Sequence, residues 1–224
     1  MAPRVRGPER APLFPPGTEG NHSGMLNLAR SLPLRPRSSA RSDVVRSVAR
    51  AAHDVGAAAL LGGNLFARVA MHPVLGGLGS PRERGTATNR AWRRYGVVNS
   101  LGLGAILAGW GLARGAAAQT GRRDPVARCL ARANDAAVAA VAVTGIAAAI
   151  EGLRFAGSAP GGAVPLVDGD TPSPDASSRE ARMKTVLRRL GGLNLAAEVA
   201  LVTVNAALAQ RDGHGPPLRG RLLR

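Results

Sequence analysis

Aromatic residues, lysine and cysteine are scarce in this 224-residue chain. Aromatics make up 3% of it, as three Phe, two Trp and one Tyr. Because aromatic side chains bury the most surface per residue, an ordinary soluble core is hard to build from this composition. Cys129 is the one cysteine, which excludes an intramolecular disulfide framework and a cysteine-rich metal site.

The sequence also lacks the signatures of common catalytic and nucleotide-binding sites. Its glycine-rich runs follow no predicted strand and lack the Lys-Ser/Thr ending of a phosphate-binding loop. No Ser-His-Asp, HExxH or CxxC arrangement occurs at a workable spacing. His53 and His72 lie ~28 Å apart along one predicted helix, too far to hold one haem iron. We therefore expect a non-enzymatic protein with no cofactor and no metal.

The chain does contain apolar runs of membrane-crossing length. Residues 95–113 contain no charged residue, and residues 190–210 contain one charged residue, Glu198. Each run matches the ~20 residues that a helix needs to cross a ~30 Å hydrocarbon layer. Two weaker runs hold a few polar residues, which the interior of a bundle would shelter. The predicted fold is all-α, an integral membrane four-helix bundle with helices over about 51–71, 95–114, 132–153 and 188–210.

The polar segments around these runs predict two tails and a long loop. Seven of the sixteen prolines fall within residues 1–41, and residues 1–50 carry a net charge of +6, so residues 1–45 are predicted to be a disordered basic cytoplasmic tail. Residues 155–180 are rich in Pro, Gly, Ser and Asp without periodicity, which predicts a disordered extracytoplasmic loop. Residues 212–224 form a basic C-terminal tail.

The net charge of +16 has two opposing interpretations. A nucleic-acid binder needs stacking aromatics or a recognition helix among its basic residues, and the N-terminal tail has Phe14 alone. The charges instead flank the apolar runs. The two tails and the 114–135 connection hold 18 Arg, against 11 Lys plus Arg in the other two connections, which predicts a plasma-membrane protein with both termini cytoplasmic.

The expected partners follow from this topology. Basic segments beside membrane helices attract a lipid bilayer with anionic head groups. Small Gly/Ala faces on the helices favour a protein partner or a second copy of the chain. No nucleic acid is expected.

Polar residues share one face of the first and fourth predicted helices. At 100° per residue, they fall within arcs of ~100° and ~40°. The residues are His53, Asp54, Asn64, Arg68 and His72 on the first helix, and Asn194, Glu198 and Asn205 on the fourth. Their depths predict an Arg68–Glu198 ion pair between the two helices. His53 and Asp54 are expected to pair with Arg128 or Arg132, or with Asn205.

Three functions are compatible with these polar faces. The favoured one is structural, since interhelical polar contacts hold membrane helices together; the protein is then a non-catalytic envelope scaffold or accessory subunit. The alternative is a small transporter or proton-linked channel that uses Glu198, Arg68, His53 and Asp54. A soluble basic nucleic-acid-binding protein is the least favoured.

Three aromatic residues near the ends of the second helix are predicted to be interfacial anchors. They are Trp92 and Tyr95 at its outer end and Trp110 near its inner end. Ordinary helix packing is the alternative role for these side chains.

Two motifs resemble an uncharacterised actinobacterial family of small four-helix integral membrane proteins. One is ARAAHDVGAA at residues 49–58, followed by Gly62-Gly63-Asn64-Leu65, and the other is NRAWRRYGVVN at residues 89–99. The resemblance covers about residues 48–150. It implies a membrane location and a four-helix form, and it brings no activity.

Overall fold

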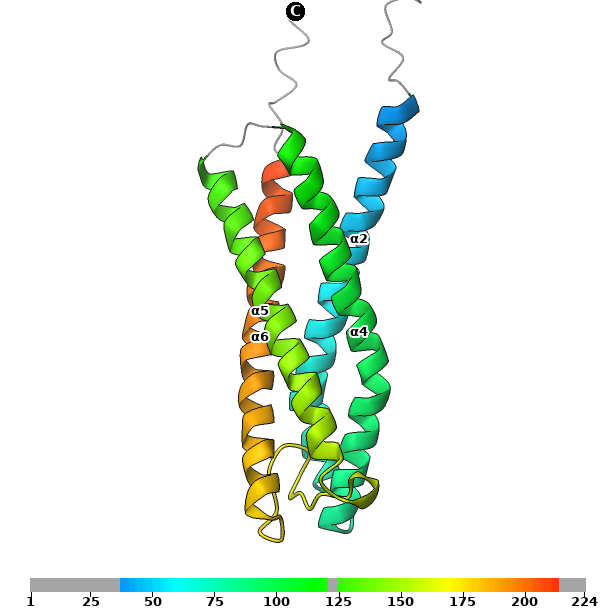
Figure 1. Cartoon of the computed structure of the whole chain (residues 1–224), viewed down its shortest axis with the longest axis vertical. Helices are drawn as coiled ribbons and strands as arrows, with labels where there is room; N and C mark the ends of the chain where they lie inside the picture. The colour runs from blue at the N-terminus through cyan, green and yellow to red at the C-terminus, as the bar shows by residue number, and fades with distance from the viewer. Residues whose placement is uncertain (1–36, 121–124, 214–224) are drawn as a thin grey trace, which may run out of the picture. The chain divides into compact units, whose positions relative to one another are not determined.

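The computed structural model describes residues 37–120 and 125–213, and the chain from Ser42 onward forms one compact unit. Its elements are helix α2 (Arg37–Phe66), π-helix η1 (Ala67–Met71), α3 (His72–Leu75), α4 (Pro81–Thr120), α5 (Pro125–Ala156), the 3₁₀ turn η2 (Pro160–Gly162) and α6 (Ser178–Gly213). Four stretches are long and apolar enough to cross a membrane: Val44–Leu75, Pro81–Gly115, Pro125–Ala156 and Ser178–Arg211 (Figure 1). The predicted all-α, four-helix fold is confirmed.

The helices are longer than the apolar runs that predicted them. Helix α4 begins at Pro81 and α6 begins at Ser178, both well before the apolar residues start. The reason is a capping box at each start. The backbone N–H of Ser80 donates to Glu83 Oε2 at 3.1 Å, and the Glu83 N–H donates to Ser80 Oγ at 3.2 Å. Such reciprocal bonds satisfy the free N–H groups of a first turn and so fix where the helix begins.

The start of α6 has the same capping box. The Ser177 N–H donates to Glu180 Oε2 at 2.8 Å, and the Glu180 N–H donates to Ser177 Oγ at 3.3 Å. Both boxes follow the pattern Ser-x-x-Glu, and in α4 a proline occupies the first helical position, where its missing N–H costs nothing. Both helices therefore extend beyond their apolar runs at the same end of the bundle.

The first long helix ends through a change of helix type. Helix α2 passes into the π-helix η1 and then into the short α3, which contains Pro73. Proline has no N–H to donate to the preceding turn, and a widened turn accommodates that missing bond. Arg68 lies inside η1.

The four long helices run alternately up and down (Figure 1). The start of α2 within the unit, the end of α4, the start of α5 and the end of α6 lie at one end, and the 157–177 loop lies at the other. A buried apolar cluster fills the middle of the bundle. Its members are Ala57, Leu60, Ile106, Ala137, Val138, Val141 and Leu201, with Leu103, Trp110 and Ala197 packed against them.

The loop of residues 157–177 is ordered, so the prediction of a disordered loop at 155–180 is wrong. Val164 and Leu166 have no exposed surface and pack with Phe155 at the end of α5. The Leu166 N–H donates to Pro81 O at 3.0 Å, and a single antiparallel bridge joins Leu166 to Pro172. The composition predicted disorder because Val164 and Leu166, in a segment rich in Pro, Gly, Ser and Asp, give no periodic pattern. Packed against the helix ends, these two side chains are enough to order the loop.

The predicted tails fall largely outside the described residues. Residues 1–36 and 214–224 are not described, so disordered basic tails stay a prediction for those residues. Residues 37–45 and 212–213 are exceptions, because they belong to α2 and α6 and are helical. The helix starts earlier than the apolar pattern indicated, since polar residues such as Arg and Ser are compatible with a helix that extends past its apolar face.

Candidate functional site

The polar faces of α2 and α6 meet inside the bundle. Asn205 Nδ2 donates to His53 Nε2 at 2.9 Å, and Asn64 Nδ2 donates to Glu198 Oε1 at 2.6 Å. His53 Nδ1 donates to Ile106 O of α4 at 2.9 Å, so both ring nitrogens are bonded and the neutral tautomer with its proton on Nδ1 fits both partners. Of the partners expected for His53, the structure selects Asn205.

Glu198 is at the centre of a cluster built from three helices. Its side chain is 1% exposed, and its Oε1 accepts hydrogen bonds from Asn64 of α2 and Asn194 of α6, both at 2.6 Å. Thr144 of α5 adds a hydroxyl 2.8 Å from Asn194 Oδ1. Glu198 Oε2 is buried and has no hydrogen-bond partner among the described atoms. We call Asn64, Thr144, Asn194 and Glu198 the carboxyl cluster.

The predicted Arg68–Glu198 ion pair is wrong. Arg68 Nη2 instead lies beside Gly191 and donates to Arg188 O at a long 3.4 Å. Gly191 is seven residues, ~10 Å, along α6 from Glu198. The predicted pair required the Arg68 side chain to point along the bundle axis towards Glu198. In the antiparallel packing of α2 and α6, Asn64 lies opposite Glu198. Arg68, one turn further along the chain in η1, lies opposite the earlier residues Arg188 and Gly191 of α6.

Asp54 also departs from the prediction. It was expected to face the bundle interior beside His53, but it is exposed on α2, and Arg128 and Arg132 are exposed on α5. The helical angle of Asp54 lies at the edge of the polar arc, so a small rotation of α2 moves it outside the interface. The carboxyl cluster therefore contains neither Asp54 nor Arg68.

Glycines bring α2 and α4 into contact along a seam. A Cβ on Gly56 would lie 2.6 Å from Gly102 O, and a Cβ on Gly109 would lie 2.6 Å from His53 Cβ. Distances below 3.0 Å require the backbones to separate, so only glycine permits this approach. We call Gly56, Gly63, Gly102 and Gly109 the glycine seam. The two glycines of each helix are seven residues apart, which keeps them on one face.

The three aromatic residues of α4 contact other helices. Tyr95 donates its hydroxyl to Ala59 O at 2.6 Å, and Trp92 donates Nε1 to His72 Nε2 at 3.3 Å. Trp110 donates Nε1 to Asp135 Oδ1 of α5 at 2.8 Å, and Arg114 forms an ion pair with the same carboxylate. These are helix-packing contacts. Their position relative to a membrane surface stays a prediction.

The loop end of the bundle holds a second buried polar group that the sequence analysis missed. Lys184 of α6 is 4% exposed, donates Nζ to Gly169 O at 2.7 Å and lies 3.5 Å from Asp170 Oδ1. Its ammonium also lies 5.7 Å from the centre of the Phe155 ring. A signal was present, because Lys184 is the chain's one lysine among 29 arginines. An ammonium is a compact point charge and a guanidinium is a planar fork, so lysine and arginine are not interchangeable at an enclosed site.

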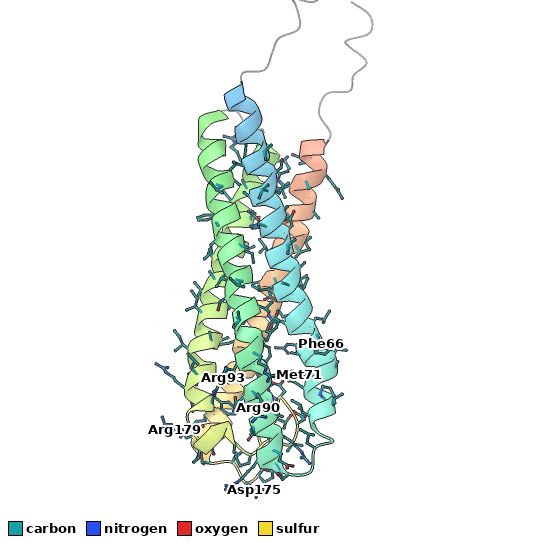
Figure 2. The ribbon with its side chains drawn as sticks, turned by 90° about the vertical axis from the view of Figure 1, so that its right-hand side faces the viewer. Phe66, Met71, Arg90, Arg93, Asp175 and Arg179 are labelled. Carbon is teal, nitrogen blue, oxygen red and sulfur yellow. The ribbon has the colours of Figure 1, made fainter. Side chains whose placement is uncertain are left out.

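Other side chains fasten the same loop to α4. Arg84 donates Nη1 to Val167 O and Nε to Leu78 O, each at 2.9 Å, and buried Asn89 donates Nδ2 to Gly162 O at 2.7 Å. The Gly169 N–H donates to His72 O at 3.0 Å. We call residues 157–177, with the helix ends they contact, the cap. Figure 2 shows Arg90 and Arg93 of α4 and Arg179 of α6 at this end of the bundle, with Asp175 near its tip.

Within the cap, Asp168 organises the tightest turn. Its Oδ1 accepts the N–H groups of Asp170 at 2.5 Å and Thr171 at 2.7 Å, and its Oδ2 accepts the Thr171 hydroxyl at 3.2 Å. Partial burial alone would raise the pKa of the Asp168 carboxyl. The two backbone N–H groups and the hydroxyl outweigh burial and lower its pKa below the ordinary value, because they stabilise the ionised form.

The described residues offer no grouping suited to a bound metal. No three His, Cys, Asp or Glu side chains come together among them, and Cys129 is exposed. Two surface depressions of about 310 and 290 Å³ lie at opposite ends, one lined by Pro125, Arg128, Cys129 and Arg132 and the other by Ser80, Pro81, Arg82, Pro165 and Asp175. Neither is lined by the carboxyl cluster.

Comparison with protein-family profiles, curated proteins and solved structures finds no match to this chain. The resemblance to the actinobacterial four-helix family therefore stays a prediction.

Proposed function

We propose that this chain is a non-catalytic membrane scaffold or accessory subunit, built as a multi-pass four-helix unit. The observation that supports this role is that polar side chains on the long helices bond to one another across helices. His53 bonds to Asn205, and Asn64 bonds to Glu198. Interhelical hydrogen bonds and close glycine contacts are the main forces that assemble helices in lipid, where burial of apolar surface gives no drive.

The proposed setting is the plasma membrane, with both termini in the cytoplasm and the cap on the other side. The described unit has the start of α2 and the end of α6 at one end, as an even number of crossings requires (Figure 1). In the sequence, the two tails and the 114–135 connection hold 18 Arg, against 11 Lys plus Arg in the other two connections. This asymmetry supports contact between the cytoplasmic end and anionic lipid head groups.

A protein partner or a second copy would need a free small-residue face. The glycine seam is used within the chain. On α4, Gly104 and Gly111 are seven residues apart and have open space where a Cβ would lie. Under the scaffold proposal this is the face for helix contact, and Gly104→Leu should weaken any complex seen by crosslinking in membranes while leaving insertion intact.

A small transporter or proton-linked channel is the second candidate. The observation that favours it is Glu198 Oε2, a buried carboxyl oxygen with no partner among the described atoms. Arg68 and Asp54, also expected to serve transport, lie outside the carboxyl cluster. This candidate then rests on Glu198, with His53 about three turns from Asn64 along α2 and its partner Asn205 about two turns from Glu198 along α6.

Glu198→Gln distinguishes the two functions, because glutamine keeps the shape and removes the titratable group. The scaffold role predicts that the variant inserts and assembles as the wild type does, and that neither protein moves protons or solutes across liposomes. Flux through the wild type that Glu198→Gln abolishes would overturn the scaffold role. Release of the protein from membranes by high-salt and carbonate washing would overturn both, and reporter fusions at each connection test the topology.

A further inference from the structure

The carboxyl cluster contains a hydrogen-bond chain with two satisfied arrangements of protons. Thr144 has one hydroxyl proton and two acceptors within reach, Ala140 O at 2.6 Å and Asn194 Oδ1 at 2.8 Å. Asn194 lies between Thr144 and Glu198, with its amide nitrogen 2.6 Å from Glu198 Oε1. The oxygen and nitrogen of an amide exchange places when the group turns over, so both orientations of Asn194 fit the same space.

In the first arrangement Glu198 is ionised. Thr144 donates to Asn194 Oδ1, and Asn194 Nδ2 donates to Glu198 Oε1. Asn64 Nδ2 donates to the same oxygen from α2. The carboxylate then has two amide donors, which is the kind of charge-assisted bonding that a buried anion requires.

In the second arrangement Glu198 carries a proton. The Asn194 amide turns over, so that its oxygen accepts the Glu198 O–H and its nitrogen donates to Thr144 Oγ1. Thr144 then donates to Ala140 O, its other acceptor. Asn64 keeps its bond to Glu198. Every bond of the chain is again made, no backbone moves, and the two arrangements differ by one proton.

We propose that Glu198, Asn194 and Thr144 form a reversible proton-binding site inside the bundle. The step is the addition of one proton to the Glu198 carboxylate, with no other bond formed or broken. A polar chain that is satisfied in only one protonation state would resist the other, because a buried donor or acceptor without a partner is costly. The Thr144 hydroxyl, the Asn194 amide and Glu198 Oε1 are bonded in both states of this chain, and Glu198 Oε2 takes part in neither arrangement.

The surroundings of Glu198 leave the proton without a competing cation. Helix α2 contributes the neutral Asn64, and its Arg68 reaches Gly191 rather than Glu198. Helix α4 contributes Tyr95, which lies within electrostatic reach of Glu198 and donates its hydroxyl to Ala59 O. Helix α5 contributes Thr144, and α6 itself contributes Asn194. Among these described neighbours no cation pairs with Glu198, so a proton is the available neutralising charge.

Dicyclohexylcarbodiimide tests the site directly, because this apolar reagent modifies protonated carboxyl groups in apolar surroundings. The full chain in liposomes is treated at a series of pH values, and modified residues are mapped by mass spectrometry. We expect modification at Glu198 that falls about tenfold for each pH unit above its midpoint, as for a single titrating group. Glu198→Gln should lose the modified peptide.

Asn64→Leu removes a donor that bonds more strongly to the ionised carboxyl than to the protonated one. We therefore expect modification to persist to higher pH, by about one pH unit. Thr203→Val is the matched control, since Thr203 is an exposed residue of α6 that bonds only within its own helix, to Val199 O, and it should leave the pH profile unchanged.

Two results would overturn the proposal. One is a Glu198 that never reacts in the folded protein although it reacts after denaturation, and the other is a rate of modification that does not vary with pH. Both are read on the wild type, so they do not depend on whether a variant folds. Proton binding without flux across the membrane is compatible with the scaffold role. If Glu198 does not bind a proton, the scaffold role is not affected.

Discussion

The bundle interior and the cap use different chemistry to hold helices together. Inside the bundle, uncharged amides, a hydroxyl and one carboxyl bond to each other, and glycines allow backbones to touch. In the cap, the cationic side chains of Arg84 and Lys184 donate to loop carbonyl groups around Val164 and Leu166. These cations are tolerable because loop carbonyl groups and the Asp170 carboxylate accept from them, whereas an unpaired charge in hydrocarbon would cost several kcal/mol. The difference marks where the proposed membrane ends.

Close backbone contacts should give the largest effects and separate the two regions. Gly56→Val inserts side-chain atoms where even a Cβ would lie 2.6 Å from Gly102 O, so α2 and α4 must part, at a cost of about 1–3 kcal/mol or more. The unfolding midpoint of the whole bundle in detergent should fall. Gly62→Val, at an open and exposed position of α2, is the control and should leave that midpoint unchanged.

The corresponding change in the cap is Gly85→Ala, where a Cβ would lie 1.9 Å from Val164 O. The loop must move away from α4, while the bundle keeps its contacts. Amide hydrogen exchange should speed up across residues 157–177 with little change in the bundle. A loss of protection in the bundle as large as that in the loop would show that the two regions unfold as one.

Lys184→Met should have the next largest effect, and it should stay within the cap. The change removes the bonds from Nζ to Gly169 O and Asp170, and bonds to charged groups are worth about 1.5–3 kcal/mol. We expect faster hydrogen exchange at the loop amides, with an unchanged unfolding midpoint for the bundle. Arg182→Met alters an exposed cation of the same helix, and equal effects of both variants would contradict a special role for Lys184.

Asn64→Leu should destabilise the bundle modestly. It removes one of two donors to Glu198 Oε1, and measured interhelical hydrogen bonds in membrane proteins are worth about 0.6 kcal/mol, with a maximum near ~1.7. The unfolding midpoint in detergent should fall less than with Gly56→Val, and cap protection should not change. An effect larger than that of Gly56→Val would mean that polar bonds, rather than close packing, dominate the interior.

Acid should loosen the cap by the smallest amount. The pKa of Asp168 is lowered by its hydrogen bonds, so its contribution is complete above the ordinary carboxyl pKa and is lost as pH falls through the lowered value. Hydrogen exchange at the Asp170 and Thr171 amides should increase on acidification. Asp168→Ala should show that increase already at neutral pH and lose this part of the pH dependence. An unchanged wild-type profile would contradict the role of Asp168.

The sequence predicted which faces of α2 and α6 are polar, but not how far one helix is displaced along the other. A helix places residues at fixed angles, so the polar arcs predicted that the polar faces of α2 and α6 meet, and Asn205 was one of the partners named for His53. The bond between Asn64 and Glu198 was not predicted. The partner of Arg68 depended on how α2 slides along α6, and side-chain spacing within one helix carries no information about that displacement. Thr144 was missed for a related reason, since one hydroxyl in an Ala/Val run gains meaning only when Asn194 lies beside it.

The sequence by itself determined four apolar helices and a basic border, because hydrophobic length and charge placement are local properties. The Ser-x-x-Glu capping boxes that lengthen α4 and α6 are local as well, but the predicted helix starts were based on the apolar runs and did not include them. Only the tertiary structure decided that Glu198 bonds to two asparagines, that Gly56 meets Gly102, and that Lys184 is enclosed by an ordered loop. Apart from the Asn194–Glu198 bond within α6, these contacts join residues far apart in the chain, and their geometry is fixed by packing among helices.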